Sequence, residues 1–148
     1  MARADARRGE ASARTPPEMI TALDTSVLLA IAKRERTARH WANVLETARK
    51  QGDLVICDIV AAELYAFWQD DTGYDVFVAG LGATFSPINE ATAREAGRIF
   101  AGYRQQGGPR EHLIPDFLVA AHALRQTDQL AAIDRGYLRR YFPELKLL

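Results

Sequence analysis

The 148-residue sequence contains one cysteine, Cys57, and three scattered histidines, His40, His112 and His122. A single cysteine excludes an internal disulfide framework, and these four residues show none of the short spacings that bind structural zinc. We therefore expect a reducing, cytoplasmic setting. We expect His40 and His112 to lie at the surface, and His122 to pack inside an apolar helix rather than to act in catalysis.

The sequence also lacks a net charge and a long apolar run. Nineteen basic residues balance nineteen acidic ones, so nucleic-acid binding would depend on local patches rather than on the overall field. The longest segment without a charged residue, 76–89, contains Gly, Ser, Pro and Asn and is shorter than the roughly 20 apolar residues that span a bilayer. We expect a soluble protein without a membrane partner.

The composition that remains is that of one globular domain. With 48% hydrophobic and 26% charged residues, the chain can form one substantial core. Residues 1–18 differ, because they are rich in Arg and Ala and lack the apolar run of a secretion signal. We expect 1–18 to be a disordered extension or a segment that precedes the true start at Met19, and 19–148 to form the domain.

Apolar patterns along the chain predict strands that alternate with helices. Strands are expected at 20–23, 53–57, 84–88 and 130–133, with a further edge strand at 145–148. Helices are expected over 27–31, 37–51, 58–67, 74–81, 90–103 and 115–124, with Asp58 as a helix cap, and a short aromatic and basic segment follows at 137–142. This alternation predicts an α/β domain with a central, mostly parallel sheet of four to five strands flanked by helices.

Four carboxylates stand beside apolar sequence: Asp24, Glu63, Asp116 and Asp134. Asp24 and Asp134 directly follow predicted strands, and open parallel sheets bind ligands at the carboxyl ends of their strands. Like charges gathered in one crevice raise each other's pKa or require a cation, and oxygen ligands favour hard divalent ions. A fold that brings the four together would form a site for Mg²⁺ or Mn²⁺.

Each acid also has an ordinary structural explanation. Taken singly, Asp24 and Asp134 would be cap or turn residues, and Asp116 would complement the dipole of the helix that it opens. Glu63 is different, because a carboxylate among apolar helix residues costs free energy unless it is paired or exposed. The metal-site hypothesis therefore depends on the whole set.

Taken in order, the motifs resemble a known family. They are Leu23-Asp24-Thr25-Ser26, Ala62-Glu63-Leu64, the helix that starts Pro115-Asp116 and continues to Ala120-Ala121-His122, and finally Asp134. The series resembles PIN domains across residues 19–148, and closely the VapC-type toxin ribonucleases of toxin–antitoxin systems. The resemblance lies in the ordered set, because Asp-Thr-Ser alone is a weak motif. Around the fourth acid the chain departs from the family, with Ala132 in place of Thr or Ser and Gly136 in place of an acid or Asn.

The resemblance implies an endoribonuclease that cleaves RNA with one or two Mg²⁺ or Mn²⁺ ions. Asp24, Glu63 and Asp116 would then bind metal, Asp134 would complete the site or orient the attacking water, and Ser26 would support a carboxylate or a phosphate. A toxin of this type also implies a small cognate antitoxin as a partner, and a homodimer.

Two basic clusters, 33–39 and 135–140, follow acids in the sequence, and from them Arg34, Arg36 and Arg135 are candidate RNA contacts. The main alternative function is a PIN-like module that has lost activity and binds RNA or protein. A haloacid-dehalogenase phosphatase needs an Asp where Ser26 stands, and a receiver domain needs paired acids after its first strand. Both are disfavoured.

Overall fold

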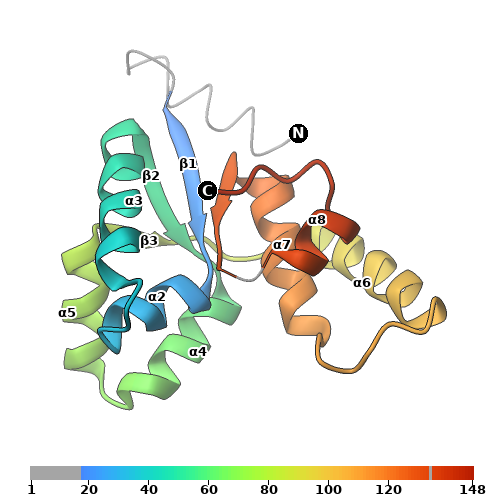
Figure 1. Cartoon of the computed structure of the whole chain (residues 1–148), viewed down its shortest axis with the longest axis horizontal. Coiled ribbons are helices and arrows are strands. Elements are labelled where there is room, and N and C mark those ends of the chain that lie inside the picture. Colours follow the sequence, from blue (N-terminus) through green and yellow to red (C-terminus); the bar gives the residue numbers. More distant parts are fainter. Residues whose placement is uncertain (1–17, 134) are drawn as a thin grey trace.

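The computed structural model describes residues 18–133 and 135–148. Its sheet has four parallel strands in the order β3–β2–β1–β4 (Figure 1). The strands are β1 (Met19–Leu23), β2 (Gly52–Ile56), β3 (Ala83–Phe85) and β4 (Gln129–Ala131). The predicted α/β fold with a parallel, helix-flanked sheet is therefore confirmed.

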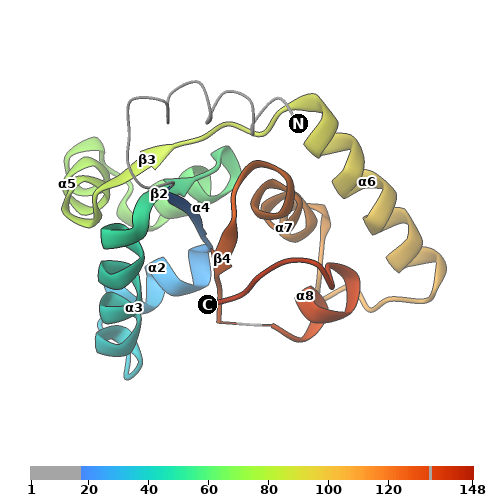
Figure 2. The same cartoon turned by 90° about the horizontal axis from the view of Figure 1, so that it is seen from above.

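Helices cover both faces of this sheet (Figure 2). One side carries α2 (Thr25–Ala32), α3 (Ala38–Gln51), α4 (Asp58–Trp68) and α5 (Asp71–Leu81). The other side carries α6 (Glu90–Gln105), α7 (Ile114–Gln126) and α8 (Gly136–Tyr141). Among residues 18–133 and 135–148, no helix combines the length and apolar character needed to cross a membrane.

The two edges of the sheet have less strand than the sequence predicts. The strand expected at 84–88 ends at Phe85, and Pro87, which lacks an N–H donor, cannot extend the ladder. The edge strand expected at 145–148 is reduced to one bridge between Leu130 and Leu147. Two backbone hydrogen bonds flank that bridge, from Leu130 N–H to the Lys146 carbonyl (2.9 Å) and from Leu148 N–H to the Leu130 carbonyl (3.0 Å).

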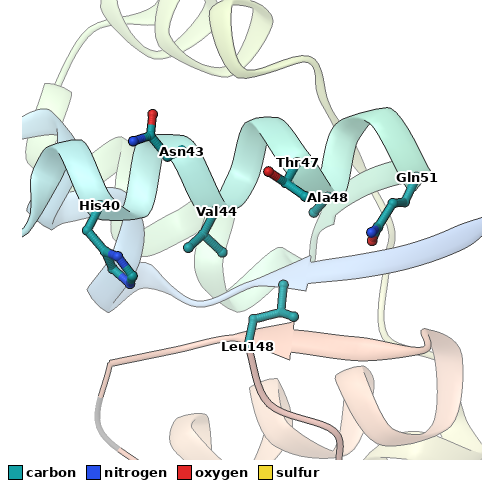
Figure 3. A pocket seen from close by; sticks show the side chains of 7 residues that line it. All are labelled: His40, Asn43, Val44, Thr47, Ala48, Gln51 and Leu148. Atoms are coloured by element: carbon teal, nitrogen blue, oxygen red, sulfur yellow. The ribbon is translucent and has the colours of Figure 1, made fainter.

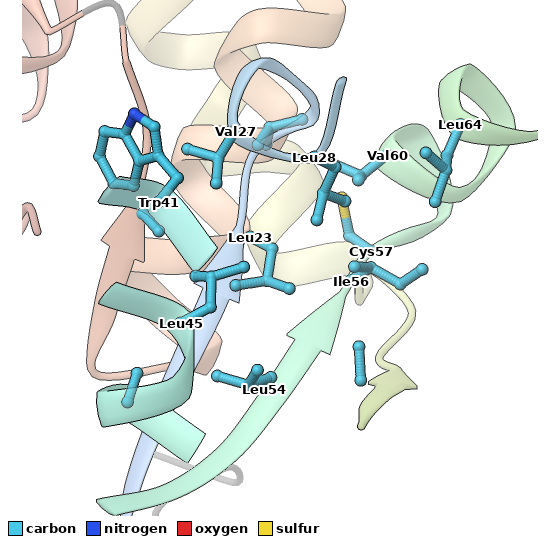
Figure 4. Close-up of a cluster of buried hydrophobic side chains, with 14 residues drawn as sticks. Leu23, Val27, Leu28, Trp41, Leu45, Leu54, Ile56, Cys57, Val60 and Leu64 are labelled. Carbon is cyan, nitrogen blue, oxygen red and sulfur yellow. The ribbon is translucent and has the colours of Figure 1, made fainter. Parts of the chain in front are cut away.

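A core cluster lies on each face of the sheet. On the α2–α5 side, one buried cluster contains Leu23 and Leu54 of the strands together with Val27, Trp41 and Leu64 of the helices (Figure 4). On the other side, buried Phe117 of α7 packs against residues of the remaining helices, and its ring lies 5.1 Å from Tyr103 and 5.8 Å from Phe142, centroid to centroid. Strands β1, β2 and β4 are largely buried on both faces and mostly apolar, as in parallel sheets, whereas the edge strand β3 is exposed beyond Ala83.

Local interactions set where the helices begin. Asn89 accepts from Thr92 N–H at 2.8 Å and caps α6, and Asp70 caps α5 in the same way. The predicted cap at Asp58 is wrong, because Cys57 occupies the cap position and Asp58 is the first helical residue. An acid in the first turn still stabilises the helix through its dipole, so the charge keeps a structural role there.

His122 is buried in α7, as predicted. Its side chain is 1% exposed, and Nε2 lies 3.0 Å from Ser86 Oγ. Burial lowers the pKa of His122 from 6.5 to about 4, although the nearby Asp58 charge opposes that shift. The imidazole is therefore neutral near pH 7 and acts as a packed, hydrogen-bonded group.

Candidate functional site

Asp24, Glu63 and Asp116 lie toward the carboxyl end of the sheet. Strands β1 and β2 lead directly into α2 and α4 at this edge, and α7 begins on the same side of the molecule (Figure 1). Asp24 is the residue between β1 and α2, and its backbone N–H bonds the Ala131 carbonyl of β4 at 3.0 Å. Backbone pairing thus fixes Asp24 at the carboxyl ends of β1 and its neighbour β4.

The Asp24 side chain is held by Ser26. One carboxylate oxygen, Oδ2, accepts from Ser26 N–H at 3.1 Å and from the Ser26 hydroxyl, and this caps α2. Ser26 Oγ also accepts from Ile133 N–H at 3.2 Å, which connects the exit of β4 to the start of α2. Ser26 therefore orients the carboxylate and joins the two segments that border it.

Glu63 reaches the same edge from α4. Its Oε1 accepts a 2.6 Å hydrogen bond from Thr25 Oγ1, the residue that follows Asp24. The surroundings of Glu63 differ from those that its sequence neighbours suggest. Val60 and Leu64 are fully buried, whereas Glu63 lies off that face and is exposed, so its charge carries little desolvation cost.

Asp116 lies in the first turn of α7 and caps it. Its Oδ2 accepts from Leu113 N–H at 3.0 Å, and His112 Nδ1 lies 3.8 Å from the same oxygen. Asp116 therefore has the structural role at the start of its helix that the sequence suggested. This role uses only one carboxylate oxygen, Oδ2. The Asp116 carboxylate is also partly exposed, and its negative charge acts on Asp24.

The negative charges of Glu63 and Asp116 act on the Asp24 carboxylate. The pKa of Asp24 is raised, first by burial and further by the negative charges of Glu63 and Asp116, while the Ser26 hydrogen bonds act in the opposite direction. Glu63 and Asp116, both far from Asp24 in the sequence, thus act on its carboxylate. The fourth candidate, Asp134, lies outside the described residues.

The donor chemistry of these acids fits a hard divalent cation, since all are carboxylates and Asp24 is destabilised as an anion. The positions, however, do not form a finished cage. Within residues 18–133 and 135–148, no three His, Cys, Asp or Glu side chains are grouped closely enough to hold a metal ion. Each of the three acids instead accepts a local hydrogen bond, from Ser26, Thr25 or Leu113.

The candidate RNA contacts have different surroundings. Arg34 and Arg36 are exposed in the turn after α2, where Arg34 adopts a left-handed conformation with φ of 56°. Arg135 is half-buried, because its Nε donates to the Ala132 carbonyl at 3.0 Å and its guanidinium lies 5.7 Å from the centre of the Trp41 ring. Arg135 is thus partly committed to packing, and the other two are available to solvent.

Several cavities lie outside the acidic group. One, of about 310 Å³, lies between α3 and the C-terminal Leu148 (Figure 3), and no acid or arginine lines it. A second, of about 540 Å³, lies between α3 and the end of α5. A third, of about 560 Å³, lies between the 109–112 loop and α8, and His112 forms part of its wall. His112 was expected at the surface but is half-buried, with its ring stacked on Tyr137 at a centroid distance of 4.0 Å. Sequence spacing gave no sign of this pair.

Known structures share this fold. VapBC2 from Rickettsia felis, solved with a DNA fragment from its promoter, is 23% identical with a TM-score of 0.69, covering 88% of this chain and 98% of that one. VapBC-1 from nontypeable Haemophilus influenzae is 19% identical with a TM-score of 0.66, covering 88% and 97%. FitAcB from Neisseria gonorrhoeae is 20% identical with a TM-score of 0.59, covering 86% and 96%. Among curated proteins there is no significant match.

The sequence also matches a family model. It is the model of the PIN domain, and the match spans residues 21–143. This range contains most of β1, the other three strands and all the helices described above. A match over most of the chain, with the parallel sheet and the acids at its carboxyl end, shows that the chain belongs to the PIN domain family.

Proposed function

We propose that this PIN-domain protein is a VapC-type toxin, an endoribonuclease that uses Mg²⁺ or Mn²⁺ to cleave RNA phosphodiester bonds. One observation carries the proposal: the charges of Glu63 and Asp116 both raise the pKa of Asp24 at the carboxyl end of the sheet. A chain that gathers negative charge around a half-buried carboxylate gains stability when a cation binds there.

In this proposal, Asp24, Glu63 and Asp116 hold the metal, and Asp134 completes the site or orients a water molecule. A carboxylate-bound divalent ion would supply a nucleophile from water and stabilise charge on the phosphate. Ser26 keeps Asp24 oriented, and Thr25 keeps Glu63 oriented, through the hydrogen bonds described above. The exposed Arg34 and Arg36 would contact RNA phosphates, and Arg135 would do so from the other side of Asp24.

We further propose a small antitoxin that covers the acidic edge and a homodimer as the working form. Both follow from the resemblance to VapC-type toxins, and the fold that this chain shares with the VapBC structures supports the first of them, the antitoxin. Copurification with the product of a neighbouring short reading frame, and the mass of the purified protein in solution, test these two statements separately.

The decisive experiment measures cleavage of a single-stranded RNA pool by purified protein with Mg²⁺, with Mn²⁺ and with a chelator. Wild-type protein should cleave only with a divalent ion, and Asp116→Asn, which keeps the size but removes the charge, should lose at least about a hundredfold in rate. Asp75→Asn, a change at an exposed acid of α5, is the matched control for the loss of a carboxylate away from the site. Equal cleavage by all three proteins would overturn the proposal.

A second candidate is an inactive PIN-like module that binds RNA or protein. It is favoured by the absence, among the described residues, of a finished three-carboxylate cluster. RNA binding without metal-dependent cleavage, at several salt concentrations and with both metals, would select this candidate.

A further inference from the structure

The cavity beside α8 is lined mainly by rings. Its volume of about 560 Å³ lies within the range of sites that bind small molecules, about 300–1,000 Å³. Its lining includes Tyr103, Glu111, His112, Tyr137, Arg140 and Tyr141. Four of its eight lining residues therefore carry an aromatic or imidazole ring.

The rings are held in place from behind. Tyr103 is buried, its hydroxyl donates to the Pro109 carbonyl, and its ring meets Tyr141 edge-on with centroids 5.0 Å apart. Gly108 lets the loop backbone approach this ring, because a Cβ there would lie 2.6 Å from Tyr103 ring atoms. The wall is therefore preorganised, and binding would cost little ordering of side chains.

The cavity adjoins the acidic edge through one residue. His112 lines the cavity and stacks on Tyr137, while its Nδ1 lies 3.8 Å from the Asp116 carboxylate. A group bound in the cavity would thus lie next to one of the proposed metal ligands. This is the position expected for a nucleotide that flanks the scissile bond.

The charges favour a base over a bare phosphate. Arg140, with its guanidinium 5.3 Å from the centre of the Tyr141 ring, is the arginine in the lining, and Glu111 is the carboxylate. Glu111 would repel a phosphate but can accept a hydrogen bond from the amino group of a base. Unstacked bases of single-stranded RNA bind to aromatic rings and to guanidinium planes in this way.

We propose that this cavity is a nucleobase subsite, in which one unpaired base of the RNA stacks against the Tyr137 and Tyr141 rings while Arg140 contacts its phosphate. The inference rests on the proposed function, since it assigns a flanking nucleotide to the same RNA substrate. It gives the enzyme a means of selecting a single-stranded target next to the acids. It also gives α8 a role in binding.

The test uses full-length protein, a chelator and a 2′-O-methyl single-stranded RNA, so that binding is measured by fluorescence anisotropy without cleavage. Tyr137→Ala should weaken binding about five- to a hundredfold, whereas Tyr137→Phe, which keeps the stacking face, should bind within about twofold of wild type. Arg140→Gln should weaken binding severalfold, and Arg139→Gln, at an exposed neighbour on α8 outside the lining, should not.

Wild-type affinity in both Tyr137→Ala and Arg140→Gln would overturn the subsite, as would equal competition by inorganic phosphate and by cytidine monophosphate. Because Arg140 is exposed, its variant keeps the test valid if Tyr137→Ala does not fold. The two proposals fail differently. Metal-dependent cleavage with unaltered binding in the variants would remove only the subsite, and variant-sensitive binding without any cleavage would remove only the nuclease.

Discussion

The hydroxyl of Thr25 donates a 2.6 Å hydrogen bond to Oε1 of Glu63, which joins the first turn of α2 to the middle of α4. The two residues are 38 positions apart in the sequence. Thr25 follows Asp24 directly, so this bond places Glu63 beside the carboxylate whose pKa its charge raises. One short polar contact thus couples two of the proposed metal ligands.

Thr25→Val keeps the side-chain shape of Thr25 but removes the donor. Glu63 would then sample other rotamers, and we expect RNA cleavage at saturating metal to fall about five- to tenfold, the usual consequence of losing roughly 1 kcal/mol of orientation. Thr25→Ser retains the hydroxyl and is the matched control. Identical kcat/KM values for the Val and Ser variants would show that the bond does not position Glu63.

Asp24→Asn should stabilise the metal-free protein at pH 7. The folded-state pKa of Asp24 is raised above 3.8, so its contribution to stability is fully present below pH 3.8 and is lost as the pH rises through the folded value. The Asn variant does not suffer this loss. Urea unfolding with a chelator should therefore give a higher unfolding free energy for the variant at pH 7, and a difference that shrinks toward pH 3.8.

Divalent metal should make wild-type protein more stable than Asp24→Asn, the reverse of the order expected without metal. A cation that binds only the folded state raises stability by RT ln(1 + [L]/Kd), about 2.7 kcal/mol at a hundredfold excess over Kd. We expect millimolar Mg²⁺ or Mn²⁺ to raise the melting temperature of wild-type protein and of Asp75→Asn, but not that of Asp24→Asn or Asp116→Asn. Equal shifts in all four proteins would place the bound metal elsewhere.

His122 should make the fold sensitive to mild acid. Its folded pKa of about 4 lies below the unfolded value of 6.5, so its stabilisation is present above pH 6.5 and is lost progressively as the pH falls toward 4. This difference between the unfolded and folded pKa values corresponds to about 3 kcal/mol of unfolding free energy. His122→Gln should flatten the profile of unfolding free energy between pH 7 and 4, with His40→Gln, a change at an exposed site, as the control.

Gly52 and Gly97 should respond to alanine in opposite directions. A Cβ at Gly52 would lie 2.0 Å from the Met19 carbonyl oxygen across the β1–β2 pair, so Gly52→Ala should destabilise the fold by about 2 kcal/mol or more. Gly97 is exposed in α6 with open space around it, so Gly97→Ala should stabilise the fold by about 0.5–1 kcal/mol. Thermal melts of both variants check the pair.

The sequence by itself determined the order of the elements and the class of fold. Periodicity in residues such as Trp41, Leu45 and Ala48 marks a buried helix face without knowledge of the partner, because helix geometry repeats locally. The apolar strands before Asp24 and Cys57 likewise predict a sheet covered on both faces. Boundaries that depend on neighbours were less well predicted, as Asp58 and the 145–148 segment show.

The order of the acids in the sequence was enough to predict the candidate metal ligands. Only the tertiary structure decided what surrounds each of them. The bond from Thr25 to Glu63 and the effect of the Asp116 charge on Asp24 depend on how α2, α4 and α7 pack at one sheet edge. The stacked His112 and Tyr137, 25 residues apart, form a cavity wall that no spacing rule predicts. Local order follows from backbone geometry that each segment carries alone, whereas a site is a set of distances between segments, and these exist only after the core has formed.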